Sequence, residues 1–367
     1  MSAHQHLRPG LCRGCGQPVG ERDRFCEVCG RPDPLSPVVG DVADVPAPGA
    51  GAVCVDCGGA DVGADGYCGG CGLRQPSGRE HVESELDGLA AAVSDLGLRR
   101  SRNEDAFALA ALPSGACAVV CDGVATAPGS EDASRLAADA AAAVLAGRVS
   151  RGADPREATR EAVRRAVRIV ADLAGDPESG PACTFVSAVV DGPGVTVGWV
   201  GDSRAYWLAP GGSRLLTRDD SWAAQMVESG ELSAADAWAD RRAHLLTAWL
   251  GADAGAVEPG IASFRPPGPG LVMLCSDELW NHLPEPADLA AVALNGTSGP
   301  GGAFGPNTVG PNTVGQDVMR RGVLGSGGAL AAARRLLRAA LDAGGHDNIT
   351  VAAIPVPPPE PTREPGR

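Results

Sequence analysis

The sequence contains no lysine, so all 31 of its basic residues are arginines. This absence excludes the phosphate-binding lysine of a P-loop and any mechanism that runs through a lysine Schiff base. Aromatic residues are also few, with six tryptophans, five phenylalanines and two tyrosines among 367 residues. The 45 acidic residues give a formal net charge of −14. This charge argues against nucleic acid as the main partner, because phosphate backbones bind clustered positive charge.

Long apolar runs are missing as well. No run approaches the roughly 20 residues that span a bilayer, and residues 1–10 lack the apolar stretch of a secretory signal. We therefore expect a cytoplasmic protein that does not bind membranes. In that reducing compartment, the twelve cysteines are expected to be metal ligands or buried thiols rather than disulfides.

Eight of the cysteines form a repeated pattern. Two Cys-x2-Cys pairs with ten residues between them recur 42 positions further along, as Cys12, Cys15, Cys26 and Cys29 and then as Cys54, Cys57, Cys68 and Cys71. Four thiolates complete the tetrahedral shell of a structural Zn²⁺ ion. The pattern predicts two small four-cysteine zinc ribbons, residues 10–31 and 53–74, with one zinc ion each. The alternative is a redox Cys-x2-Cys pair, for which the sequence lacks a thioredoxin-like context.

Composition divides the rest of the chain. Residues 32–52 and 75–85 are predicted to be linkers, and residues 357–367 a disordered tail. Between residues 86 and 356, β-leaning apolar runs alternate with helical patterns, which predicts one α+β domain with sheets packed against helices. The expected strands are 105–112, 116–121, 183–190, 195–200, 203–208, 270–275 and 349–354. The expected helices are 132–149, 155–174, 219–240 and 328–343.

Four aspartates stand at the ends of these apolar runs: Asp105, Asp122, Asp277 and Asp347. A carboxylate in such a place is costly to bury unless a cation compensates its charge. If the fold brings the four together, their oxygens suit hard divalent cations, magnesium or manganese rather than zinc. Taken singly, each aspartate could equally cap a turn.

In their order and flanking residues, these motifs resemble the metal-dependent protein phosphatase 2C family over about residues 93–356. The segments that carry the resemblance include RRSRNEDAFAL, VVCDGV, VGWVGDSRAYWL, LVMLCSDELW and HDNITVAAI. The resemblance implies a four-layer α-β-β-α sandwich with a binuclear metal site at one edge. It further implies hydrolysis of phosphoserine or phosphothreonine in proteins by a metal-activated water, and hence a phosphorylated protein substrate and an opposing serine/threonine kinase. We expect the chain to be a monomer.

Site residues follow from the resemblance by motif position. The residues assigned to two, or three, Mn²⁺ or Mg²⁺ ions are Glu104, Asp105, Asp122, Gly123, Asp277 and Asp347. Asp122 would bridge two ions, Gly123 would lend its carbonyl oxygen, and Glu104 and Asp105 would hold metal-bound waters. Arg100 stands where the family has its phosphate-binding arginine, so Arg100 and Asp122 are the predicted catalytic residues.

The sequence departs from the family pattern beside two of these motifs. Residues 124–127 read Val-Ala-Thr-Ala in place of Met-Gly-Gly-His, and Glu278 replaces the glycine that follows the third aspartate. Two alternatives to an active phosphatase therefore stay open. One is a catalytically impaired pseudophosphatase that binds phosphoproteins. The other is a zinc-ribbon adaptor for nucleic acid or a large assembly, although the ribbons are expected to localise or regulate the phosphatase.

The remaining polar candidates are assigned no chemistry. The six histidines show no metal-ligand spacing among themselves beyond His4 and His6, and the Gly201–Asp202 turn is expected to support the site structurally. Four further cysteines are expected to be buried core thiols: Cys117, Cys121, Cys183 and Cys275.

Overall fold

The computed structural model describes residues 78–124, 129–175, 180–210, 212–295 and 328–357, together with parts of 53–75. Nearer the N-terminus it describes three two-residue strands, β1 (Gly10–Leu11), β2 (Pro18–Val19) and β3 (Val38–Val39). The first predicted zinc site, with Cys12, Cys15, Cys26 and Cys29, lies outside the described residues. The predicted tail beyond residue 357 lies outside them as well.

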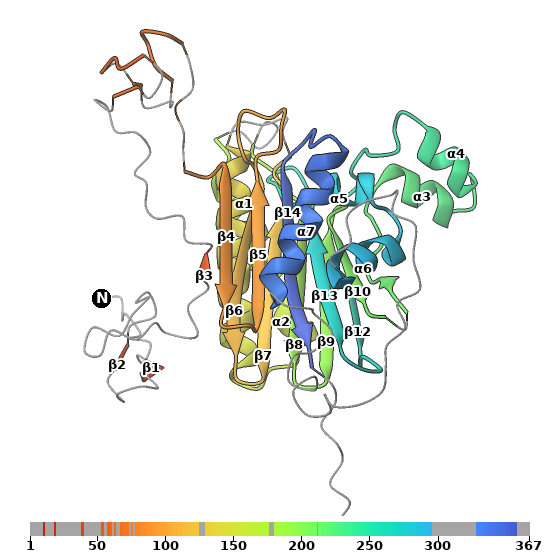
Figure 1. Ribbon diagram of the computed structural model, residues 1–367. Coiled ribbons are helices and arrows are strands. Elements are labelled where there is room, and N and C mark those ends of the chain that lie inside the picture. The colour runs from red at the N-terminus through yellow and green to blue at the C-terminus, as the bar shows by residue number, and fades with distance from the viewer. Residues whose placement is uncertain are drawn as a thin grey trace, which may run out of the picture.

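Two six-stranded antiparallel sheets pack face to face, with helices on the outer face of each (Figure 1). The first sheet contains, in order, β11 (Arg214–Leu215), β10 (Arg204–Leu208), β13 (Gly270–Cys275), β14 (Ile349–Val356), β5 (Ala90–Asp95) and β4 (His81–Leu86). The second contains β12 (Gly260–Phe264), β9 (Gly194–Val200), β8 (Phe185–Asp191), β7 (Gly115–Cys121), β6 (Ala106–Leu112) and β3. This arrangement confirms the expected α-β-β-α sandwich.

Three apolar layers hold the sandwich together. Between the sheets lie large side chains such as Phe107, Trp207 and Ile354. The helices α1 (Ser130–Val149) and α2 (Pro155–Asp172) cover the second sheet with a face made mostly of alanine and valine. On the first sheet lie three helices, α5 (Asp277–His282), α6 (Pro286–Asn295) and α7 (Gly328–Ala343). Within the described part of the chain, no helix has the length and apolar character needed to cross a bilayer.

The predicted helix over 219–240 is wrong. The segment forms two short helices, α3 (Trp222–Glu228) and α4 (Ala234–Ala239), which stand beside the sandwich (Figure 1). Gly230 adopts a φ of 74° between them, and the Ser233 side chain accepts a hydrogen bond from the Asp236 amide to begin the second helix. A positive φ and a new N-cap interrupt the helical pattern although its apolar spacing continues.

Several elements were not expected from the sequence. Strand β4 occupies residues 81–86, of which all but the last lie in the range assigned to the linker 75–85, and it pairs with β5 along its whole length. Strand β3 lies in the other predicted linker and pairs with β6 at Val38 and Val39. Both are edge strands, and edge strands in proteins are often short or carry charged side chains, which leaves no continuous apolar run to recognise. The domain boundaries themselves stay predictions.

Candidate active site and metal centres

Two of the aspartates lie side by side at one end of the second sheet. Ala106 of β6 pairs with Cys121 of β7 in antiparallel register. Asp105 directly precedes the first strand and Asp122 directly follows the second, so the register places them next to each other. The start of β6 and the end of β7 thus bring the two carboxylates to the same edge of the sheet.

The first sheet contributes three more aspartates to this edge. Strand β13 ends at Cys275, at the level where its neighbours β10 and β14 begin. Asp277, two residues beyond β13, therefore lies near Asp202, which precedes β10, and near Asp347, which precedes β14. The five carboxylates come from both sheets and meet where the sheets face each other.

Hydrogen bonds through Asn348 tie the two sheets together beneath these aspartates. Its side-chain oxygen accepts a hydrogen bond from the Glu104 amide at 2.8 Å, and its side-chain nitrogen donates to the carbonyls of Leu96 and Arg102. The Gly123 amide donates to the Glu104 carbonyl at 3.1 Å. A Cβ at Gly123 would lie 2.7 Å from that oxygen, so only glycine permits this approach of the two chains.

Burial and mutual repulsion raise the pKa values of the clustered carboxyl groups. Burial, with Asp105 and Asp277 nearby, holds the pKa of Asp122 well above its usual range. Burial raises the pKa of Asp105 to about 7, and burial together with Asp347 raises that of Asp277 to about 6. The pKa of Asp202 is likewise raised by burial and by Asp277. This edge of the sandwich is therefore short of positive charge.

Arg100 and Glu104 lie at the outer side of the cluster. The Arg100 guanidinium donates a hydrogen bond to Asp347 Oδ2. Burial raises the pKa of the Glu104 carboxyl, while the positive charge of Arg100 opposes that shift. Both residues are thus beside the carboxylates, where the sequence analysis expected them, and their roles there stay predictions.

The cluster has the properties of a site for hard divalent cations. Both carboxylate oxygens of Asp105 are buried without a direct hydrogen bond, and the nearby Ser276 and Thr350 hydroxyls offset only part of the rise in its pKa on burial. Buried polar atoms are normally paired, so a carboxylate so poorly paired at the centre of an acidic cluster indicates a contact with a cation or with water bound to a cation. All five side chains offer oxygen, which favours magnesium or manganese over zinc. The residues present fit the expected binuclear centre.

Asp202 is a member of this cluster that the sequence analysis treated only as support. Asp202 is 6% exposed, and its backbone carbonyl oxygen accepts a hydrogen bond of 2.9 Å from the Trp280 indole nitrogen. The available signal was its position directly before a buried strand, the same position that marked Asp105.

A buried ion pair lies behind the site. The Arg204 guanidinium donates two hydrogen bonds to the carboxylate of Asp219, at 2.9 and 2.7 Å. The same guanidinium lies over the Trp280 ring, 3.6 Å from its centroid. Because Trp280 in turn bonds to Asp202, this pair fixes the position of the turn that carries the fifth aspartate.

Two histidines without ligand spacing in the sequence also lie close together near the site. His282 and His346 both lie against Glu278, the residue that departs from the family pattern. Their spacing in the chain gives no sign of this, because His282 ends α5 and His346 lies in the turn before β14.

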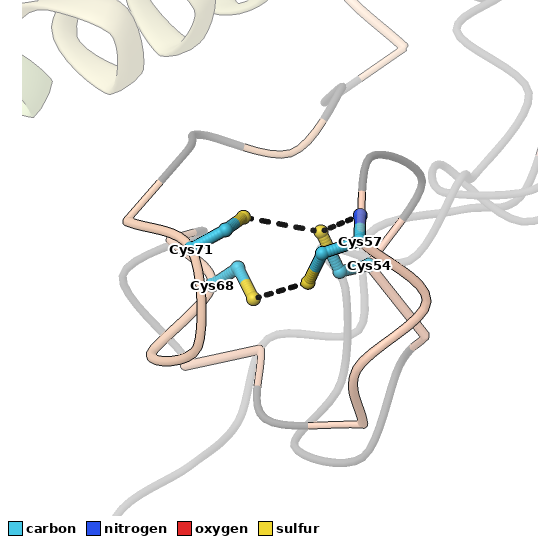
Figure 2. Close-up of side chains that lie close together, drawn as sticks. All are labelled: Cys54, Cys57, Cys68 and Cys71. Carbon is cyan, nitrogen blue, oxygen red and sulfur yellow. Dashed lines mark hydrogen bonds between the residues drawn. The ribbon is translucent and has the colours of Figure 1, made fainter.

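The second set of predicted zinc ligands is brought together as expected. Figure 2 shows Cys54, Cys57, Cys68 and Cys71 with their sulfur atoms facing one another. The Cys54 and Cys71 sulfurs are 3.6 Å apart, as are those of Cys57 and Cys68. In each Cys-x2-Cys pair the glycine after the second cysteine has a positive φ, 73° at position 58 and 75° at position 72. All four sulfurs lie within 4.8 Å of one another, so one ion can contact all of them.

The four remaining cysteines are buried in the sandwich, as predicted. Burial raises the pKa of Cys117 to about 12 and that of Cys121 well above its usual value. Buried thiols with raised pKa values are poor nucleophiles, because the thiolate is the reactive form.

Sequence comparison relates the chain to known phosphatases. Residues 99–254 match the family described as protein phosphatase 2C. The serine/threonine phosphatase stp of Listeria welshimeri serovar 6b is 36% identical over 109 residues, which are 29% of this chain and 42% of that protein. The chain thus aligns with less than half the length of the curated relatives it matches.

Solved structures extend the similarity to the whole sandwich. A serine/threonine phosphatase of Mycobacterium tuberculosis is 25% identical with a TM-score of 0.56, over 73% of this chain and 98% of that one. The catalytic domain of the serine/threonine protein phosphatase PstP, solved with two manganese ions, is 26% identical with a TM-score of 0.52, over 73% and 97% of the two chains. Residues 99–254 are therefore similar to the protein phosphatase 2C family, and the sandwich has the fold of these serine/threonine phosphatases.

Proposed function

We propose that this chain hydrolyses phosphoserine and phosphothreonine monoesters in proteins at a binuclear manganese or magnesium centre. The observation that carries the proposal is the convergence of five aspartates on one edge of the sandwich, with both oxygens of Asp105 buried and without a direct hydrogen bond. The family relationship supports it, and the PstP structure contains two manganese ions at about a quarter sequence identity.

In this proposal, Asp122, Asp277 and Asp347 bind the cations, and Asp105 and Glu104 hold ordered water around them. Bound divalent cations supply the positive charge that acidifies an attacking water and neutralises the phosphoryl oxygens. Gly123 contributes the close backbone approach that keeps Asp122 beside Asp105.

Arg100 is proposed to bind the phosphate of the substrate. Its guanidinium already lies at the carboxylates through its bond to Asp347, and the chain contains no lysine that could replace it. A planar guanidinium can donate two parallel hydrogen bonds to phosphate oxygens, which a lysine cannot.

A covalent cysteine mechanism is disfavoured. Cys121 directly precedes Asp122, but its thiol is buried and its pKa is raised by burial and by the neighbouring Cys183. Attack by water is therefore the mechanism that the local chemistry supports.

The cluster of Cys54, Cys57, Cys68 and Cys71 is proposed to bind one structural Zn²⁺ ion. A Zn–S bond of about 2.3 Å places the sulfurs of a tetrahedral site about 3.8 Å apart. The two sulfur–sulfur separations of 3.6 Å are close to that value and far longer than a disulfide bond. The module is proposed to localise or regulate the phosphatase, together with the first ribbon expected from the sequence.

The substrate is proposed to be a cytoplasmic protein that a serine/threonine kinase has phosphorylated, and the enzyme is proposed to act as a monomer. No described helix could span a membrane, which is compatible with this setting. The chain therefore belongs, in this proposal, to a phosphorylation cycle with an opposing kinase.

The test is phosphate release from a phosphothreonine peptide by the full chain with manganese. We expect turnover that disappears on chelation and falls at least about 100-fold in Asp122→Asn, because a bridging ligand is lost. Asp172→Asn is the matched control, since Asp172 is an exposed residue at the end of α2. A wild-type rate no higher than that of Asp122→Asn would reject the enzyme and leave phosphoprotein binding without turnover.

A further inference from the structure

Three side chains beside the phosphatase site form a separate group of metal-type donors. Glu278 and His282 lie on α5, and His346 lies in the turn before β14. His282 Nε2 is 3.0 Å from Glu278 Oε1, and His346 Nδ1 is 3.9 Å from the same oxygen. One donor atom from each residue lies within 4.8 Å of the other two, so a single ion can contact all three.

The local structure holds each donor in place. Glu278 and His282 are four residues apart on a helix, which puts them on the same face. The His346 amide donates a hydrogen bond to Glu278 Oε1, which ties the turn to the helix. Gly344 has a φ of 142°, and a Cβ there would lie 2.6 Å from His346 Cε1. Glycine at that position therefore leaves room for the imidazole ring.

The donor set differs in kind from the aspartate cluster. Two imidazole nitrogens and one carboxylate oxygen suit zinc and related transition metals, whereas a site with oxygen ligands alone suits manganese and magnesium. Zn–N and Zn–O bonds of about 2.0–2.1 Å place tetrahedral donors about 3.4 Å apart. The distances from Glu278 Oε1 to the His282 and His346 nitrogens, 3.0 and 3.9 Å, lie on either side of that value.

Burial supports the same interpretation. Glu278 is only 5% exposed, so its carboxylate has lost most of its hydration. The His282 side chain is 21% exposed and that of His346 is 50% exposed, which leaves a path for an ion to enter from solvent. Three protein donors with an open side are typical of a site that keeps a coordination position for water or another ligand.

We propose that Glu278, His282 and His346 bind one divalent transition-metal ion of the zinc class, at a site distinct from the aspartate cluster. Glu278 follows Asp277 and His346 precedes Asp347, so each of the two peptide segments carries one ligand for each site. The proposal concerns binding alone and does not depend on phosphatase turnover.

Zinc stoichiometry of the full chain tests the proposal. Metal-free protein is dialysed against a buffered low concentration of zinc with excess magnesium, which keeps the aspartate cluster occupied by the harder ion. We expect His282→Gln and His346→Gln each to bind one zinc ion fewer than the wild type. His244→Gln is the matched control, because His244 stacks on Trp280 outside the cluster and should leave the count unchanged.

Cobalt as a probe identifies the ligands. The wild-type spectrum minus that of His282→Gln should contain a visible d–d band without a thiolate charge-transfer band, since the lost site holds no sulfur. Far-ultraviolet circular dichroism and the unfolding midpoint establish that each variant is folded. If His282→Gln does not fold, His346→Gln replaces it in the difference spectrum, because His346 is a half-exposed turn residue. Equal zinc counts in wild type and folded variants would overturn the proposal, and so would a difference spectrum with thiolate bands. Neither result bears on phosphate release, so the proposed phosphatase activity stands or falls separately.

Discussion

At the residue scale, both side chains of the Arg204–Asp219 ion pair are buried, with 9% of Arg204 and 3% of Asp219 exposed. Asp219→Asn should leave the Arg204 charge buried without its counterion. Loss of one partner of a buried pair costs about 3–5 kcal/mol, so the free energy of unfolding should fall by that order. Urea unfolding monitored by circular dichroism measures the change.

The matched control is an exposed pair on α2. Glu157 and Arg160 are 2.6 Å apart, with side chains 61% and 35% exposed. Glu157→Gln should cost less than about 1 kcal/mol, because water screens such pairs. If both variants lost the same stability, burial of the Arg204–Asp219 pair would not be what makes it important.

The acidic cluster predicts an unusual pH dependence for the metal-free chain. The pKa values of about 7 for Asp105 and about 6 for Asp277 lie above the unfolded value of about 4. The folded chain therefore holds protons that the unfolded chain releases, and the free energy of unfolding falls as pH rises from about 4 to about 7. Asp105→Asn removes one of these titrating carboxyl groups at nearly constant shape. The free energy of unfolding of this variant should therefore fall less than that of the wild type over the same pH range.

Urea unfolding at pH 5 and pH 7.5 in the presence of a chelator measures both slopes. Comparison of the wild type with Asp105→Asn cancels the contribution of the cysteine sites, because both proteins contain them. Identical slopes would contradict the raised pKa of Asp105. Added manganese should restore stability at pH 7.5 in the wild type, because bound cations stabilise the ionised carboxylates.

At the element scale, the contact between α2 and β9 depends on the absence of a side chain. A Cβ at Gly198 would overlap the Thr159 methyl group, and Thr159 is held by a hydrogen bond of 2.7 Å to the Pro155 carbonyl. Gly198→Ala should therefore push α2 outward and cost about 1–3 kcal/mol of folding free energy. Thermal and urea unfolding measure the loss.

Gly194, on the same strand, provides the control. A Cβ there would meet only the Asp191 carbonyl at 3.5 Å, an ordinary contact, so Gly194→Ala should change stability by less than about 1 kcal/mol. Adding Thr159→Ser to Gly198→Ala removes the clashing methyl and keeps the hydroxyl, and should recover part of the loss. No recovery would show that the strain lies elsewhere.

The predictable elements are those whose stability comes from continuous apolar burial. Strands β7 and β13 are buried along nearly all of their length, and their runs were recognisable in the sequence. Strand β4 was not recognised, because its six residues His-Val-Glu-Ser-Glu-Leu include two glutamates and a histidine and are only partly buried at the sheet edge. The aspartates at strand ends could be predicted because each follows or precedes such a run.

Donors that meet only through tertiary structure could not be predicted in the same way. Glu278 and His282 share a helix, but α5 is six residues long and has no periodic pattern of its own. His346 reaches them because the Gly344–Gly345 turn brings the start of β14 back to α5. Sequence spacing cannot reveal a contact between segments whose separation is set by other elements.

At the scale of the whole molecule, the cysteines divide into two chemical classes. Among the described residues of their module, Cys54 and Cys68 share their small buried cluster with Val62 alone, so bound zinc should supply most of the module's folding energy. The four core cysteines lie instead in the apolar layers of the sandwich. Loss of zinc should therefore unfold the cysteine modules while the sandwich stays folded.

Thiol alkylation followed by mass spectrometry counts the cysteines that react in each state of the chain. The zinc-bound chain should react slowly at all twelve cysteines. A zinc chelator with excess magnesium should expose eight, which includes Cys12, Cys15, Cys26 and Cys29 of the predicted first ribbon. The last four should react only in denaturant, because their thiols are buried between helices and sheets. Exposure of only four thiols by the chelator would reject the first zinc site, whereas reaction of the core thiols at the same step would show that the sandwich depends on zinc.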